Sequence, residues 1–107
     1  MIDIEEFKKI EMKIGRIEKV EDVKESKNLY KFQVNFGNEK RQMIAGLKKY
    51  YKPEDFENKQ FVFVTNLKPA TIMGMESQGM ILAAEDSKGN VILIKPDKET
   101  ENGAKLR

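Results

Sequence analysis

The sequence predicts an all-β fold in which five short strands close into a small barrel. Two observations carry this prediction. Apolar residues recur with a period of two in several short runs separated by turn signals, and one segment with helical character lies between the third and fourth runs. A chain of 107 residues is long enough to bury one core, so we expect a single domain over residues 1–107.

The first predicted elements are a short N-terminal helix and a strand. Asp3 stands where it can cap the helix, with a glutamate three residues later in a capping-box pattern. Ile4 and Phe7 lie three apart, so we expect them to share the buried face of this helix. From residue 10 the apolar residues alternate, and their phase slips at Gly15, which predicts a bulge or bend there.

The second strand is the clearest in the chain. Apolar and polar side chains alternate over residues 30–36, so the apolar set should face the core and the polar set, including Lys31 and Gln33, the outside. A tight turn at Gly37-Asn38 then returns the chain, and residues 41–45 form an antiparallel third strand.

The third strand ends at Gly46, and residues 47–51 have the character of a short helix bounded by Pro53. Such a helix closes one end of many small five-stranded barrels. Residues 61–64 predict a fourth strand that is apolar on both faces. This strand should lie either centrally or beneath a cover beyond the barrel, for which a partner subunit is one candidate.

The fourth strand must stop near Pro69, because proline cannot donate to a sheet ladder. A flexible loop containing Gly74 and Gly79 then leads to a fifth strand over residues 80–84. A turn, a short strand over residues 91–94 and a polar tail form a C-terminal β extension. Five strands with one helix between the third and fourth are the pattern of an OB-fold Greek-key barrel.

Composition argues against several kinds of chemistry. The chain has no cysteine and no histidine, which removes disulfides, thiolate metal sites and imidazole acid–base groups. Acidic residues show no metal-ligand spacing, and no phosphate-binding loop or dinucleotide fingerprint is present. We therefore expect a binding protein without cofactor or metal, not an enzyme. The N-terminus lacks the features of a secretion signal and no apolar run could span a bilayer, which favours a cytoplasmic protein without membrane contact.

Basic residues are unevenly distributed, although the net charge is only +2. A locally basic face on a nearly neutral protein suits a polyanion such as a nucleic acid. The alternative is an ordinary solvated lysine-rich surface, which is the better description of any single lysine. The second and third strands of an OB barrel, with their flanking loops, are its usual nucleic-acid surface. Between residues 27 and 52 the basic residues Lys27, Lys31, Lys40, Arg41, Lys48, Lys49 and Lys52 accompany a single acid, Glu39.

Several sequence motifs point to a family. They are the segment 7–17, Asn28-Leu29-Tyr30, Arg41-Gln42-x-x-x-Gly46, Tyr51-x-Pro53-Glu54, Asn66-Leu67-Lys68-Pro69 and Ser77-x-Gly79-Met80. In this order, and over nearly the full length, the chain resembles the tRNA-binding domains that are appended to, or associated with, methionyl-tRNA synthetases. The resemblance implies an OB-fold barrel that binds the outside of the L-shaped tRNA, usually as a homodimer.

The candidate tRNA contacts combine this resemblance with the charge pattern. Arg41 can grip a phosphate or stack on a base, and its alternative is a surface ion pair with Glu39 or another acid. Asn66 and Ser77 could contact ribose and phosphate, or instead stabilise their own turns. Met80 could lie at the tRNA-contacting rim, where the resemblance places it, or pack in the core. The full set is Lys13, Arg16, Lys27, Lys31, Gln33, Arg41, Asn66, Lys68, Ser77, Gln78 and Met80.

Few exposed aromatic residues and many lysines favour recognition of backbone shape over splayed bases. The expected role is structure-directed tRNA binding that raises the local tRNA concentration for a methionyl-tRNA synthetase. This could be the role of a β-type subunit or of a free-standing protein. The short N-terminal segment leaves no room for a catalytic domain, so the synthetase is expected in trans. A homodimer is expected from the two-faced strand and the apolar segment 91–94.

A dimeric OB-fold chaperone that binds peptides is the alternative. A small secretion-related chaperone family resembles this chain, including its tail motifs Pro96-Asp97 and Asn102-Gly103. The members of that family look less similar in the motifs around Asn66 and Ser77. The sequence therefore favours the tRNA interpretation.

Overall fold

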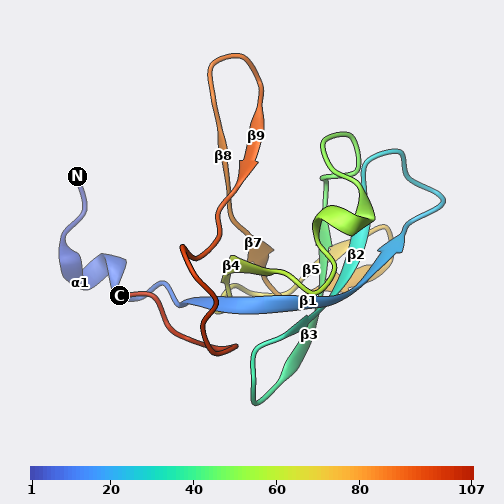
Figure 1. Ribbon diagram of the computed structural model, residues 1–107. Helices are drawn as coiled ribbons and strands as arrows, with labels where there is room; N and C mark the ends of the chain where they lie inside the picture. The colour runs from blue at the N-terminus through green and yellow to red at the C-terminus, as the bar shows by residue number, and fades with distance from the viewer.

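The computed structural model describes residues 1–107 and confirms the predicted all-β barrel (Figure 1). The elements are α1 Ile4–Phe7, β1 Met12–Asp22, β2 Tyr30–Asn35, β3 Lys40–Ala45, the 3-10 helix η1 Pro53–Asp55, β4 Gln60–Val64, β5 Ala70–Ile72, β6 Met75–Ser77, β7 Met80–Ile81, β8 Ala83–Glu85 and β9 Val91–Leu93. The main sheet is antiparallel, with the spatial order β3-β2-β1-β4-β7. β7 also lies against β3, so the sheet nearly closes on itself. None of the helices has the length and apolar character that crossing a bilayer requires.

The core lies inside this barrel and follows the predicted alternation of β2. Tyr30, Phe32 and Val34 are buried there, and the Phe32 side chain is 0% exposed. The rings of Phe32 and Phe56 pack with their centroids 4.8 Å apart. Phe63 on β4 meets Phe36 edge to face, a favourable arrangement of two aromatic rings. The interlocked rings fix the two sides of the barrel against each other.

The bulge in β1 lies three residues beyond the predicted position. The register with β2 shifts between Ile17 and Lys19, whereas Gly15 stays in regular pairing with β4. Gly15 has a different role, because a Cβ there would lie 2.7 Å from side-chain atoms of Val34 and Phe36. The phase slip in the sequence therefore marks a close approach of β1 to the core, and the bend itself is at Glu18.

The predicted helix over residues 47–51 is wrong in its position. That segment forms only a turn, and the helical residues are Pro53–Asp55, one short turn later. Proline suits the first helical position because it lacks the N–H group that would be unpaired there. The Asp55 carboxylate accepts from the backbone N–H of Lys52 at 2.8 Å, which fixes the start of η1.

The predicted flexible loop before residue 80 is instead a paired hairpin. β5 and β6 are antiparallel, with Ile72 opposite Met75. Met73 and Gly74 form the turn with φ angles of 50° and 78°, as a two-residue hairpin of this type requires. The predicted strand over residues 80–84 is divided into β7 and β8 at Leu82, which belongs to neither strand. The Leu82 N–H donates to the Val62 carbonyl of β4.

The N-terminal helix does not bury the face that was predicted. Asp3 caps it as expected by accepting from the Glu6 N–H at 3.0 Å. Ile4 and Phe7, however, are 61% and 36% exposed, because the single turn of α1 projects from the barrel and packs on no other element (Figure 1). Their apolar side chains remain available for a partner.

The two-faced strand β4 is covered by the chain itself. Each of its residues is buried, between β1 on one side and β7 on the other. The Val62 N–H donates to the Ile94 carbonyl at 3.0 Å, which brings the C-terminal part of the chain over this strand. Burial of β4 therefore requires no partner subunit.

The C-terminal tail, predicted only as polar, returns along β1. The Ile14 N–H donates to the Ala104 carbonyl at 2.8 Å, and the Leu106 N–H donates to the Met12 carbonyl at 2.9 Å. Gln60 holds the tail further upstream, through its amide oxygen to the Thr100 N–H and its amide nitrogen to the Thr100 carbonyl. The tail is thus a fixed part of the surface.

Candidate nucleic-acid interface

The lysines on the outer face of β1, β2 and β3 form ion pairs with acidic residues of the same face. Lys31 and Gln33 point outward from β2, as their alternation predicted, and both are partly buried. Lys31 lies 3.4 Å from Glu21, and Lys40 lies 2.9 Å from Glu18. Because acids accompany these lysines, the sheet face alone is less positive than the sequence indicated.

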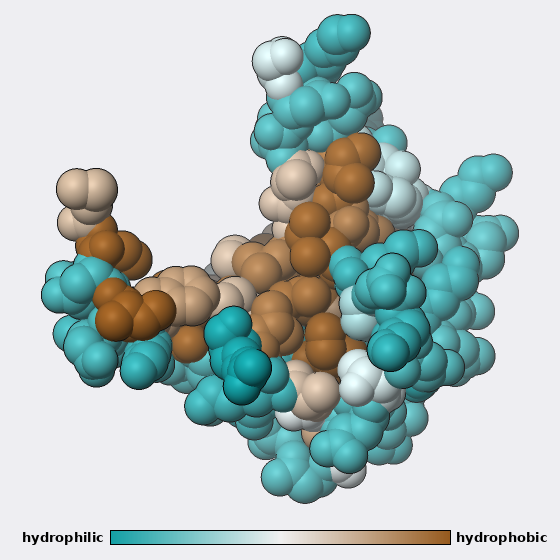
Figure 2. Space-filling view, turned by 60° about the vertical axis from the view of Figure 1, so that its left-hand side comes forward, coloured by the Kyte–Doolittle hydropathy of each residue, from teal (hydrophilic) through white to brown (hydrophobic).

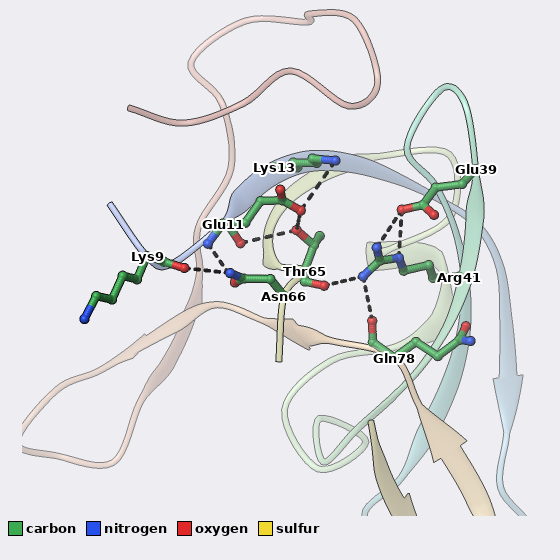
Figure 3. Close-up of polar contacts among 8 residues, drawn as sticks. All are labelled: Lys9, Glu11, Lys13, Glu39, Arg41, Thr65, Asn66 and Gln78. Carbon is green, nitrogen blue, oxygen red and sulfur yellow. Dashed lines mark hydrogen bonds and ion pairs between the residues drawn. The ribbon is translucent and has the colours of Figure 1, made fainter. Parts of the chain in front are cut away.

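Arg41 acts as a clamp at one end of the barrel (Figure 3). Its Nε donates to Glu39 at 2.8 Å, and its Nη1 donates to the backbone carbonyls of Thr65 and Gln78. The guanidinium carbon also stands 5.9 Å from the centre of the Phe36 ring. The Glu39 pair considered from the sequence is present, and the two carbonyl contacts additionally tie β3 to the ends of β4 and β6.

Asn66 fastens the N-terminal segment to the end of β4. Its amide oxygen accepts from the Glu11 N–H at 2.7 Å, and its amide nitrogen donates to the Lys9 carbonyl at 2.6 Å (Figure 3). Beside it, the Thr65 hydroxyl donates to the Glu11 carboxylate at 2.7 Å. The Asn66 motif is therefore joined to residues at the start of the chain.

We predict that Asn66→Ala loosens this N-terminal segment. Two hydrogen bonds at a partly solvated site are lost, which should cost about 1 kcal/mol in the free energy of unfolding. The sensitive readout is hydrogen exchange at the Glu11 amide, which should accelerate. Asn66→Asp is the matched control, since it keeps the acceptor for Glu11 and loses only the donor to Lys9. An unchanged exchange rate in Asn66→Ala would contradict the clamp.

Ser77 and Gln78 extend the edge of β3. The Ser77 hydroxyl accepts from the Ile44 N–H and donates to the Gly79 carbonyl, and the residue is only 4% exposed. The Gln78 side chain accepts from the Gln42 N–H at 3.0 Å. Both residues thus hold the segment before β7 against β3, the turn-stabilising role that the sequence left open for Ser77.

A hollow of about 360 Å³ lies where these motifs meet. Arg41 and Gln78 line it from one side, and Leu67 and Pro69 of the Asn66 motif from the other. We call it the Arg41 hollow. Its remaining lining residues are Glu39, Lys40 and Thr65.

The predicted site residues around this hollow fall into two groups. Arg41, Asn66, Ser77 and Gln78 have polar atoms that are hydrogen-bonded within the chain. Lys68, between Leu67 and Pro69, is exposed and forms no ion pair, and Met80 on β7 is 47% exposed. The second group offers free surface beside a framework that the first group holds in place.

Of the predicted cations only Arg41 lines the hollow; Lys68 lies between two lining residues, and Lys31 belongs to the sheet face. Lys13 pairs with Glu11 at 3.5 Å, and Arg16 is held by the Asn58 carbonyl and by Glu99. Lys27 is exposed on the segment between β1 and β2. Lys40 and Leu67 line the hollow although the candidate set omitted both. Lys40 directly precedes Arg41 at the start of the third strand, and this position in the sequence could have added Lys40 to the candidates.

The acids near this surface are held in their charged form. The Thr65 hydrogen bond lowers the pKa of Glu11, burial opposes this in part, and Lys13 lowers the pKa further. Lys40 and Asn35 lower the pKa of Glu18, and Lys19 and Lys31 lower that of Glu21. The structure contains no group of three or more acidic side chains that could hold a metal ion.

These shifts predict that the fold loses stability in acid. A carboxylate whose pKa is lowered by folding stabilises the folded state above its unfolded pKa, near 4.5 for glutamate, and this stabilisation disappears as the pH falls through the lower folded value. The melting temperature should therefore be constant from pH 7 to about pH 5 and fall below about pH 4. Circular dichroism melts across this range measure it. A constant melting temperature down to pH 3 would contradict the prediction.

The nearly closed five-stranded barrel, with a hollow at one end that Lys40 and Arg41 line, defines an OB-type domain of the nucleic-acid-binding class. Residues 12–105 match the model of the family described as "Putative tRNA binding domain". The chain belongs to this family.

Individual relatives agree with this assignment. The methionine–tRNA ligase of Methanocaldococcus jannaschii is 48% identical over 106 residues, which is 99% of this chain and 16% of that protein. The chain thus spans about a sixth of the length of that enzyme. A crystal structure of a MetRS related protein from Pyrococcus horikoshii is 43% identical, with a TM-score of 0.95 over 100% of this chain and 98% of that one.

A second kind of relative is a chaperone. The crystal structure of the CsaA chaperone protein from Picrophilus torridus is 33% identical, with a TM-score of 0.90 over the full length of both chains. The fold is therefore shared by proteins described in two ways. The family match and the ligase relatives favour tRNA binding for this chain.

Proposed function

We propose that this chain is a structure-directed tRNA-binding domain that serves a methionyl-tRNA synthetase. The observation that carries the proposal is the Arg41 hollow, where the Arg41 and Asn66 motifs of a tRNA-binding family meet beside exposed Lys68. Lysines that contact phosphates give affinity without reading sequence. The domain would hold folded tRNA by its ribose–phosphate exterior.

Within this proposal the candidate residues have two roles. The first group contacts tRNA directly and consists of Lys13, Lys27, Lys31, Gln33, Lys68 and Met80. The second group shapes the surface, and its members bind tRNA only through polar atoms that the protein leaves unpaired; it consists of Arg16, Arg41, Asn66, Ser77 and Gln78. Arg41 illustrates the second role. A guanidinium has five N–H donors, and the contacts to Glu39, Thr65 and Gln78 leave one on Nη2 for a phosphate.

Glu39 should restrain binding, because its carboxylate lies on the edge of Arg41 that a phosphate would approach. We predict that Glu39→Gln strengthens tRNA binding by about five-fold, since a neutral amide repels phosphate less. Fluorescence anisotropy with labelled tRNA measures this. Glu85→Gln, which removes an exposed charge on β8 without an ion pair, is the control. Equal affinity of Glu39→Gln and wild type would contradict a phosphate at Arg41.

The proposed role is binding without catalysis, in the cytoplasm. The ligase relatives contain the matching segment as a small part of a longer chain, and the MetRS related protein has nearly the same length as this one. A domain of this kind improves aminoacylation by raising the effective concentration of tRNA near the enzyme. We propose that it acts in trans, as a β-type subunit or as a free-standing tRNA-binding protein over residues 1–107.

We further propose a homodimer formed through the exposed apolar surface. Ile4, Phe7 and Ile10 stand out from the barrel, and together with Met12 and Leu106 they line a hollow of about 500 Å³. Figure 2 shows apolar surface that extends from the N-terminal helix across the middle of the molecule. Exposed Ile92 and Ile94 add to it at the C-terminal hairpin. Sedimentation at micromolar concentration should give a dimer, and a monomer there would refute this assembly.

A peptide-binding chaperone is the second candidate, favoured by the CsaA likeness and by the same apolar surface. One experiment separates the two functions. Folded tRNA, duplex RNA and an unfolded peptide are titrated at several salt concentrations. Binding that prefers folded tRNA and weakens steeply with salt supports the proposed function. Peptide binding that is insensitive to salt, without affinity for RNA, would replace it with the chaperone.

A further inference from the structure

A second cationic groove lies on the C-terminal tail, away from the Arg41 hollow. It has a volume of about 410 Å³ and lies between the segment that leads into β4 and the chain after β9. We call it the tail groove. Its lining residues are Arg16, Asn58, Lys59, Gln60, Phe61, Lys95, Pro96, Asp97, Lys98 and Glu99.

The charges of this groove are suited to an anion. Lys59, Lys95 and Lys98 are exposed, and none of them forms an ion pair. Glu99 is occupied by Arg16. This pattern contrasts with the sheet face, where the lysines of β2 and β3 have acidic partners. The lining also contains exposed Asp97, and the Lys59 ammonium donates to the Glu54 carbonyl at 3.3 Å, so the groove is positive on balance through Lys95 and Lys98, which have no partner.

The chain on either side of Lys95 and Lys98 is held by hydrogen bonds, from the Val62 N–H to the Ile94 carbonyl and between Gln60 and Thr100. The Gln60 side chain, 7% exposed, bonds to Thr100 through both its amide oxygen and its amide nitrogen, and also donates to Asn102. Gly103 lies so close to the residue that follows β2 that a Cβ there would be 2.1 Å from the Phe36 carbonyl oxygen. A backbone that neighbouring contacts already hold loses little conformational entropy when the groove binds an anion.

The tail groove and the Arg41 hollow are connected across one face of the sheet. Arg16 on β1, Asn35 on β2 and Lys40 on β3 are successive register partners, so they lie in one row on one side of the sheet. Arg16 lines the tail groove and Lys40 lines the Arg41 hollow. The row spans two strand spacings, about 10 Å, which one polynucleotide can cross in a few nucleotides. Glu18 lies beside the row, where it pairs with Lys40 and accepts from Asn35, so the phosphates would lie at the two ends of the row.

We infer that the tail groove binds the sugar–phosphate backbone of the same tRNA that occupies the Arg41 hollow. This inference rests on the proposed tRNA-binding function and extends its surface from the usual OB strands to the C-terminal tail. Lys95 and Lys98 are the direct phosphate contacts. Arg16 is a positioning residue, because its guanidinium holds Glu99 and the Asn58 carbonyl at the edge of the groove.

The test compares two variants that lose the same charge. Lys95→Gln/Lys98→Gln alters the groove, and Lys24→Gln/Lys88→Gln removes two exposed, unpaired lysines that line neither hollow. Binding of folded tRNA is measured at several salt concentrations. In the groove variant, the slope of log K against log salt should fall by about two, since each lysine on a phosphate contributes about one. The control variant should keep the wild-type slope.

The outcomes separate this inference from the proposed function. Tight binding by wild type with equal slopes in wild type and groove variant would overturn the tail groove and leave the Arg41 hollow standing. Equal losses in groove and control variants would also overturn it, because the effect would follow net charge alone. Absence of tRNA binding by wild type would refute both. Acetylation of lysines with and without tRNA gives a second readout, in which Lys95 and Lys98 should be protected.

Discussion

Phe32→Ala is expected to lower the free energy of unfolding by about 3–5 kcal/mol, the usual cost of removing a buried phenylalanine ring. Phe32 has no exposed surface, and its ring contacts those of Tyr30 and Phe56. On the neighbouring strands it pairs with Val20 and Met43. The substitution would leave a cavity where β1, β2, β3 and η1 meet, and this rigid barrel cannot easily collapse to fill it.

Urea unfolding followed by circular dichroism measures the effect of Phe32→Ala. Tyr50→Ala is the matched control, because Tyr50 is 52% exposed and belongs to no aromatic pair. Its change should stay within about 0.5 kcal/mol. A loss below about 1 kcal/mol for Phe32→Ala would mean that the aromatic cluster is not the centre of the core.

Arg41→Ala should both destabilise the fold and weaken tRNA binding. The Thr65 and Gln78 carbonyls would lose a charged donor at a partly buried site, which should cost about 2 kcal/mol in the free energy of unfolding. The segments at the ends of β4 and β6 would then separate from β3 and the hollow would lose its shape. We expect tRNA affinity to fall by about ten-fold or more, equivalent to about 1.4 kcal/mol.

Two further variants separate the effect of Arg41 on stability from its effect on tRNA binding. Lys68→Ala removes the same charge from an exposed residue without a partner, so it should weaken tRNA binding and leave the urea midpoint unchanged. Arg41→Lys keeps the charge but cannot reach both carbonyls and Glu39 together, so it should lose stability. Wild-type stability in both Arg41 variants would contradict the clamp.

The elements that the sequence predicted well are those whose pattern is local. β2 alternates between apolar and polar residues because one face is buried, and this period can be read without knowledge of the partner strands. The failures depend on distant parts of the chain. The apolar phase slips at Gly15, which predicted a bend there, but only the approach of Val34 and Phe36 shows why glycine is there. Ile4 and Phe7 have a helical spacing, and nothing in their segment indicates that the barrel leaves them uncovered.

The site shows the same division between local and distant information. Motifs selected Arg41, Asn66 and Ser77 as candidates; Asn66 follows the end of β4, and Ser77 ends β6, a strand that the sequence did not predict. Their hydrogen-bond partners were not predictable. Asn66 bonds to residues 55 and 57 positions earlier in the chain, and the Ser77 hydroxyl accepts from Ile44 across 33 positions. Amide and hydroxyl groups can contact either the protein or a ligand, and only the folded contacts show which atoms remain free.

The most direct test of the central claim is a nuclear magnetic resonance titration of the labelled protein with folded tRNA. If tRNA occupies the Arg41 hollow, backbone amide shifts should change at residues 39–41, 66–68 and 78. A salt concentration high enough to abolish binding should return these shifts to their values in the free protein. Changes confined to residues 4–10 and 92–94, or no changes at all, would contradict a tRNA site between the Arg41 and Asn66 motifs.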